Sequence, residues 1–163
     1  MPTSRKPEDS LLLDILDQGF ERKAWHGPNL RQSLRGVSAK MAAWRPAPER
    51  HNIWEIAIHA AYWKYRVRRG MRGDNRGSFA LEGSNWFKRP MELSQKAWRA
   101  DLALLETEHR KLRQAIVEFL EGKTQKVPAR LLFGIAFHDV YHAGQIGLLR
   151  RLYGGKIIAL KAK

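Results

Sequence analysis

Apolar side chains recur every three or four residues along most of this chain, and this repeat constrains the fold more than any other feature. It is longest between Ser94 and Gly122, where it falls at Trp98, Leu102, Leu105, His109, Leu112, Ile116 and Phe119. This spacing places the side chains on one face of an α-helix, which has about 3.6 residues per turn. No segment alternates convincingly like a strand, except a few residues at the extreme C-terminus. The repeat therefore predicts an all-α protein.

Three further segments carry the same helical repeat. They predict long helices at about residues 9–25, 52–70 and 128–154, in addition to the helix at 94–122. The start of the second is well defined, because Asn52 can cap it and Glu55 follows three residues later in a capping-box arrangement. We expect the first to end at the HGP tripeptide of residues 26–28 and the last to stop at Gly154–Gly155.

Four long helices, each with one apolar face, predict a four-helix bundle. A short extra helix is expected between the first two long ones, over residues 30–44, and a long loop over residues 70–92, which are rich in Gly, Asn and Ser. A chain of 163 residues with 44% hydrophobic residues can bury a substantial core. We therefore expect a single domain over residues 1–163, with its core at about 9–152.

The composition limits the chemistry that the chain can perform. It contains no cysteine, which excludes disulfides, thiolate metal sites and a thiol nucleophile, and leaves imidazole and carboxylate groups as metal ligands. No apolar run approaches the roughly 18 residues of a membrane span. The N-terminal MPTSRKPEDS lacks the apolar region of a signal peptide. These features predict a cytoplasmic protein.

Basic residues outnumber acidic ones by 30 to 16, which gives a formal net charge of +14. Such an excess is found in proteins that bind nucleic acid or other anions. The densest basic run is KYRVRRGMRGDNRG, residues 64–77. It is also typical of a solvated helix end and loop, and no segment resembles a recognition helix. Nucleic-acid binding is therefore the weakest of the functional hypotheses.

Two histidines interrupt the apolar stripe of the last helix. His138 and His142 are four residues apart, and side chains at this spacing on a helix have Cβ atoms roughly 5–6 Å apart. Two imidazoles so placed can reach one metal ion, and bundle cores take further ligands from facing helices. The best third candidate is His59, on the apolar stripe of the second helix. Three neutral imidazoles suit a divalent Zn, Ni, Co or Fe ion and leave a position open. The alternative is that these histidines are ordinary core residues.

Three segments resemble a known family. HDVYHAGQI at residues 138–146 and NIWEIAIHAAYW at residues 52–63 are similar to the last and second helices of the DinB/YfiT-like family. AWHGPNL at residues 24–30 is similar to a subgroup of it. The resemblance extends over roughly residues 9–152, and its most specific part is the H-x-x-x-H-x-G-Q pattern.

The resemblance implies a bundle whose helices run up, down, down and up. It also implies one divalent metal ion, usually nickel or zinc, held by His59, His138 and His142, and it implies a homodimer. Relatives include bacillithiol S-transferases and a mycothiol-dependent maleylpyruvate isomerase, which use the metal to activate a low-molecular-weight thiol. The expected partner is therefore a small-molecule substrate, and a low-molecular-weight thiol is one candidate for it.

Gln145 and Glu55 are weak candidates for a catalytic role. Gln145 lies three residues after His142 and could orient a ligand or bond to water, or it could pack against the neighbouring helix. Glu55 is one turn before His59 and could act as a general base, but helix capping already explains it.

Other polar and aromatic residues could contact the ligands or line a pocket. Asp139 and Tyr141 could bond to a ligand imidazole or make interhelix contacts. His109 could be a fourth ligand or proton carrier, although a hydrogen-bonded core histidine is the expectation. His26 could lie at a pocket mouth or cap the first helix. Trp63 could form a pocket wall. We expect His51, which precedes the second helix, to be exposed.

Two functional hypotheses remain beside nucleic-acid binding. The first is a metalloenzyme, either a hydrolase or a thiol S-transferase, because an open metal position acidifies a bound water or thiol. The second is a metal-stabilised binding or stress-response module without turnover. It is motivated by the lack of a convincing catalytic acid, base or nucleophile beside the three histidines.

Overall fold

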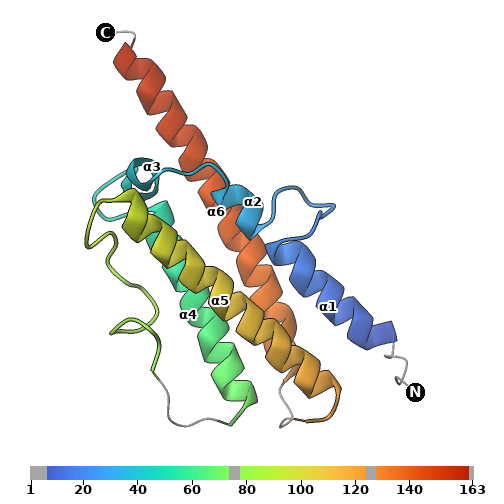
Figure 1. Cartoon of the computed structure of the whole chain (residues 1–163). Coiled ribbons are helices and arrows are strands. Elements are labelled where there is room, and N and C mark those ends of the chain that lie inside the picture. The colour runs from blue at the N-terminus through green and yellow to red at the C-terminus, as the bar shows by residue number, and fades with distance from the viewer. Residues whose placement is uncertain (1–6, 74–77, 124–127, 162–163) are drawn as a thin grey trace.

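A computed structural model describes residues 7–73, 78–123 and 128–161. Within these ranges every regular element is a helix: α1 (Pro7–Phe20), α2 (Leu30–Leu34), α3 (Ala39–Ala43), α4 (Ile53–Met71), α5 (Gln95–Leu120) and α6 (Ala129–Lys161). The four long helices pack side by side, and α1 and α6 run in one direction while α4 and α5 run in the other (Figure 1). This confirms the predicted all-α bundle and its up-down-down-up order.

The start of α4 follows from its cap. The side chain of Asn52 accepts a hydrogen bond from the backbone N–H of Glu55, at 2.8 Å, which satisfies one donor that the first helical turn leaves unpaired. The carboxylate of Glu55 does not complete a capping box, because Arg45 and His51 bind it instead. Ser94 caps α5 in the same way through the N–H of Ala97, at 3.1 Å.

Two predicted boundaries near the N-terminus are wrong. Helix α1 ends at Phe20 and not at Trp25, because the N–H groups of Glu21 and Arg22 both bond to the carbonyl of Asp17, at 2.8 Å each, and close the helix. The helical piece expected over residues 30–44 is divided into α2 and α3. Between them Gly36 has a φ of 73°, a left-handed conformation that glycine adopts without a steric penalty.

The last helix is longer than predicted. Helix α6 continues through Gly154–Gly155 to Lys161, and it projects beyond the rest of the bundle (Figure 1). Neither glycine adopts the positive φ that ends helices, in contrast to Gly122, whose φ is 73° after α5. The expectation of a few strand residues at the C-terminus is therefore also wrong. Residues 78–94 carry no regular element, which agrees with the loop predicted over 70–92.

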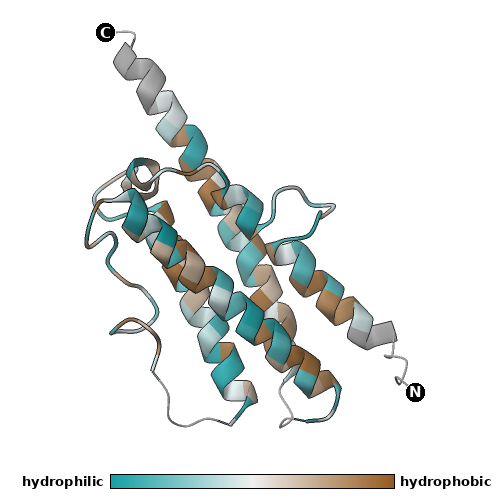
Figure 2. Ribbon diagram, in the orientation of Figure 1, coloured by the Kyte–Doolittle hydropathy of each residue, from teal (hydrophilic) through white to brown (hydrophobic). Residues whose placement is uncertain are grey.

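Apolar and hydrophilic residues alternate along the long helices (Figure 2). Most buried apolar residues of the described ranges belong to two clusters, one around Trp54 and Trp98 and the other around Leu16 and Leu112. The two indole rings lie 5.0 Å apart, and Trp98 donates to the carbonyl of Val37 at 2.8 Å. The first contact joins α4 to α5, and the second joins α5 to the connection between α2 and α3. Helix α4 also packs against α6.

Candidate metal centre

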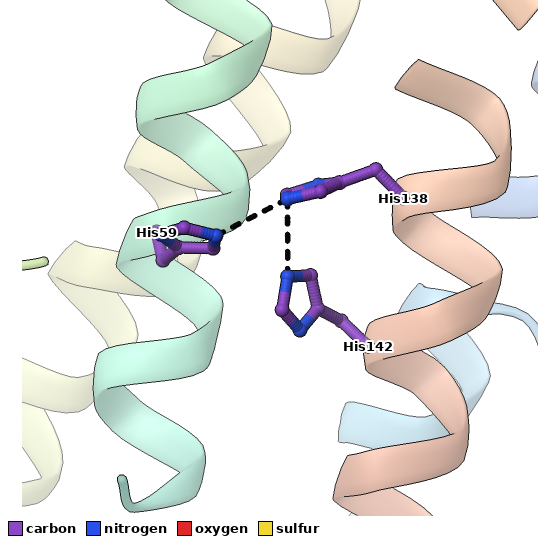
Figure 3. A group of neighbouring side chains, drawn as sticks. All are labelled: His59, His138 and His142. Atoms are coloured by element: carbon purple, nitrogen blue, oxygen red, sulfur yellow. Dashed lines mark hydrogen bonds between the residues drawn. The ribbon is translucent and has the colours of Figure 1, made fainter. Parts of the chain in front are cut away.

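Three histidine side chains meet between α4 and α6 (Figure 3). The Nε2 atom of His138 lies 3.1 Å from Nε2 of His59 and 3.1 Å from Nε2 of His142. One nitrogen from each ring lies within 4.8 Å of the other two. His59 and His142 are buried and His138 is half-buried. The i, i+4 spacing on α6 and the packing of α4 against α6 therefore direct three imidazoles to one point.

Hydrogen bonds on the outer side of two rings fix their tautomers. Nδ1 of His59 is 2.8 Å from the carbonyl oxygen of Asn85, and Nδ1 of His142 is 2.7 Å from Oε1 of Gln145. Both oxygens are acceptors, so each Nδ1 carries the proton. Each Nε2 is consequently unprotonated and presents a lone pair to the centre.

A proton alone does not satisfy this arrangement. Nε2 of His138 faces the lone pairs of both His59 and His142, and a single proton on it can bond to only one of them. Nδ1 of His138 is buried and lacks a hydrogen-bond partner in the described part of the chain. Ligand nitrogens around a tetrahedral zinc ion are about 3.3 Å apart, from Zn–N bonds of about 2.0–2.1 Å. The three residues could therefore hold a metal ion.

The surroundings keep the three imidazoles neutral. Burial lowers the pKa of His138 to about 3, with a smaller effect from the charges of His142, His59 and Lys64. Burial also lowers the pKa of His142 to about 4, against the bond to Gln145, which raises it. The pKa of His59 is lowered by burial too. Neutral imidazole is the form that binds metals, so the group is ready to bind near neutral pH.

Gln145 and Tyr141 extend the contacts of His142. Nε2 of Gln145 donates to the hydroxyl of Tyr141 at 3.0 Å, which turns Oε1 toward Nδ1 of His142. Such outer contacts orient ligand rings and raise their basicity. Gln145 thus orients a candidate ligand, one of the two roles that the sequence left open.

The loop after α4 covers the other side of the group. Asn85 has a φ of 61°, and its Oδ1 accepts from the indole N–H of Trp63 at 2.9 Å while its carbonyl bonds to His59. The ring of Trp86 stacks on that of His59 at 3.8 Å. The sequence did not point to Asn85, and it offered Trp86 only as one of six tryptophans that could anchor a loop or form a pocket wall, because a non-periodic loop gives no signal of which residues turn inward.

A pocket of about 950 Å³ opens beside the three histidines. Trp63, Trp86 and Tyr141 form aromatic parts of its wall, and leucines of α6 form an apolar part. Ligand pockets typically measure about 300–1,000 Å³ and combine apolar walls with a few polar groups. The site can therefore admit a small molecule to the three imidazoles.

Asp139 has a different partner from the one considered. It forms a fully buried ion pair with Lys64 of α4 and makes no hydrogen bond to an imidazole of the described residues. Burial raises the pKa of Asp139 to about 6, although the charge and hydrogen bond of Lys64 act to lower it. Burial lowers the pKa of Lys64. The pair joins α4 to α6 close to the histidine group. Lys64 was expected within a solvated basic run, and the structure contradicts this.

His109 does not join the group either. It is buried against Phe20, with ring centroids 3.7 Å apart, and neither ring nitrogen has a hydrogen-bond partner within the described ranges. His109 is thus a core residue as expected, but the expected hydrogen bond to it is not found among the described residues. Burial and nearby cations lower the pKa of His109 to about 2. His109 also lies near Asp17 and Glu21, but Arg113 occupies both oxygens of Asp17.

Glu55 and His26 are also placed elsewhere. Burial alone would raise the pKa of Glu55, but hydrogen bonds from Arg45 and His51 outweigh it and hold the pKa below its usual range. Glu55 is not among the residues that line the pocket. His26 is exposed in the loop after α1 and lines a separate pocket with Arg150, so it neither caps α1 nor borders the histidine group.

Much of the basic run at 64–77 is paired within the chain. Arg68 contacts Glu108 at 3.1 Å and Arg72 contacts Glu118 at 3.2 Å. The last four residues of the run lie outside the described residues. Across the part of the chain that is described, no helix combines the length and apolar character needed to cross a bilayer.

Comparison with known proteins agrees with the motifs. A family model for the DinB superfamily matches residues 24–146, a range that includes all three histidines. No curated protein and no solved structure matches the chain.

Proposed function

This chain belongs to the DinB superfamily, and from this premise we propose that it is a metal-dependent enzyme acting on a small molecule. His59, His138 and His142 hold one divalent ion, nickel or zinc, in this proposal. The observation that carries it is that Nε2 of His138 lies 3.1 Å from Nε2 of both His59 and His142, and that these two rings are protonated on Nδ1. The ordered outer hydrogen bonds support a binding site over an accidental cluster.

The ion supplies a Lewis acid that makes a coordinated thiol or water more acidic, which suits hydrolysis or the transfer of a low-molecular-weight thiol. The chain's own residues prepare the site. Asn85 and Gln145 keep the protons of His59 and His142 on Nδ1. The aromatic and leucine walls of the pocket limit the access of water and place an electrophilic substrate beside the imidazoles.

A non-catalytic metal-stabilised module is the alternative. A pocket of about 950 Å³ beside the histidines favours the enzyme, because a purely structural metal site is closed by its ligands. Nucleic-acid binding has less support, since Arg68 and Arg72 are paired with carboxylates. A dissociation constant for DNA in the micromolar range or weaker at ~150 mM salt would match nonspecific binding. This result would exclude nucleic-acid binding as the function.

The homodimer and the cytoplasmic location also stay predictions. Five large apolar side chains on α6 are exposed in the isolated chain and support self-association: Leu131 and Phe137, together with Tyr141, Leu148 and Leu152, which also line the pocket. Light scattering of the purified protein measures the mass directly.

Metal analysis tests the proposed function. Protein purified without a nickel column should contain close to one nickel or zinc ion per chain. His59→Ala should lose most of the metal, because only two of the three imidazole ligands remain. The control His26→Ala should retain the metal. Native protein without stoichiometric metal, or His59→Ala with unchanged metal content, would refute the proposal.

A further inference from the structure

Beside the three histidines, a fourth histidine, His51, lines the same pocket. His51 stacks on one face of Trp86, with ring centroids 3.6 Å apart, and His59 stacks on the opposite face at 3.8 Å. The two imidazoles are nearly parallel to the indole, at 5° and 11°. His51 therefore stands one indole ring away from the candidate metal ligands and cannot itself be one of them.

Glu55 fixes the tautomer of His51. Nδ1 of His51 lies 2.9 Å from Oε2 of Glu55. The same carboxylate accepts two hydrogen bonds from the guanidinium of Arg45 and one from the N–H of Arg89. It is buried, and these donors keep it ionised. An ionised carboxylate can only accept, so Nδ1 of His51 carries a proton, and in the neutral ring Nε2 carries the lone pair.

Nε2 of His51 is available to a ligand. It has no hydrogen-bond partner among the described residues, His51 lines the pocket, and its side chain is 45% exposed. Other polar groups of the pocket are less suited to accept a proton. Nε2 of His59 and Nε2 of His142 point at His138, and Gln145 is an amide.

We propose that His51 is the general base of this pocket, oriented by Glu55. In the step that follows, the S–H or O–H bond of a thiol or water breaks, and its proton forms an N–H bond at Nε2 of His51. The electron pair stays on sulfur or oxygen, which becomes the nucleophile. Glu55 balances the positive charge that the ring acquires. The identity of the natural nucleophile rests on the proposed function, whereas the arrangement of Glu55 and His51 does not depend on a metal.

A metal-independent proton abstraction tests this assignment. The probe is 5-nitrobenzisoxazole, a flat aromatic molecule suited to the apolar pocket. A base removes its C–H proton, the N–O bond breaks, and the electron pair moves to oxygen to give a coloured nitrophenolate. Native protein, His51→Phe and the control His26→Phe are compared in chelator and after addition of zinc. Phenylalanine retains a ring against Trp86 but cannot accept a proton.

His51→Phe should lower kcat/KM by about 10²-fold or more, the range of general-base catalysis, and His26→Phe should leave it within about twofold of native. Added zinc should leave the native rate largely intact. Native and His51→Phe rates that are equal, including both at the buffer background, would overturn the assignment. So would a rate that zinc abolishes, because the base would then be the three-histidine group.

A second variant separates base catalysis from packing. His51→Ala should regain activity on addition of imidazole, beyond the increase that imidazole gives with His26→Ala. Absence of rescue in a folded His51→Ala protein would mean that His51 acts only by packing on Trp86, and would also overturn the assignment. Metal analysis of the same zinc-treated samples tests the proposed function separately. Absence of bound zinc would refute the proposed function, whatever the rates show about His51.

Discussion

At the scale of single residues, the position of one proton on each ring determines what the histidine group can do. Asn85 and Gln145 hold that proton on Nδ1 of His59 and His142. If it moved to Nε2, the ring would present a donor to the centre and could not coordinate a cation. The residues outside the group therefore matter to it almost as much as the three imidazoles do.

Replacing Gln145 should weaken metal binding without unfolding the protein. In Gln145→Leu the acceptor for Nδ1 of His142 is lost, and affinity for zinc should fall by about 10–100-fold, the usual cost of losing such an outer contact. Competition with a chromogenic chelator measures this. The control is Gln114→Leu on α5, where an exposed glutamine bonds to Glu118. Equal affinities in the two variants would show that Gln145 does not orient His142.

His109 should make the fold sensitive to acid. Its pKa is about 2 in the folded chain and about 6.5 when unfolded. Between these values the unfolded state binds more protons, so stability rises with pH there and is lost on acidification. Lowering the pH from about 7.5 to about 5.5 should cost about 1.4 kcal/mol through this residue.

His109→Leu isolates this contribution. The variant lacks the titrating ring and its two buried nitrogens, which have no hydrogen-bond partner in the described part of the chain, so its free energy of unfolding should fall less on acidification than that of the native protein. Urea unfolding of both proteins at the two pH values measures the difference. The same pH dependence in both would contradict a neutral buried His109.

At the scale of elements, the site depends on the register of α4 against α6. The buried pair of Lys64 and Asp139 joins these helices beside the histidines. A buried ion pair is costly to desolvate, but removal of one partner is costlier, because the other charge stays buried and unpaired.

Lys64→Met should therefore destabilise the protein by about 3–5 kcal/mol. The double variant Lys64→Met/Asp139→Leu should recover most of this loss, because no charge is left unpaired. Arg66→Met, at an exposed position of the same helix, is the control and should change stability little. Urea unfolding measures all three. A Lys64→Met protein as stable as the Arg66→Met control would exclude a structural role for the pair.

The sequence contained a signal for this pair that the charge pattern obscured. Lys64 falls four residues after Ala60 and Asp139 four after Ile135, so each charge occupies a position of a buried stripe. Opposite charges on two stripes that pack together indicate an internal ion pair. Helix ends were less predictable, because the stop at Phe20 depends on bonds to one carbonyl and glycines at 154–155 can remain helical.

At the scale of the whole molecule, the second and last of the predicted long helices, α4 and α6, pack against each other. Periodicity was sufficient to place His59, His138 and His142 on facing stripes. It could not predict the loop that carries Asn85 and Trp86, because those positions depend on hydrogen bonds and stacking formed only in the folded chain. The pocket, which combines α4, α6, this loop and the segment before α4 that carries His51, could not be predicted from the sequence either.

X-ray absorption at the metal edge of the zinc- or nickel-loaded protein identifies the atoms that hold the ion. We expect one ion per chain with three imidazole nitrogens, at about 2.0–2.1 Å for zinc, and loss of one imidazole contribution in His59→Ala. A spectrum with only oxygen ligands, or one unchanged in His59→Ala, would contradict a metal centre built from His59, His138 and His142.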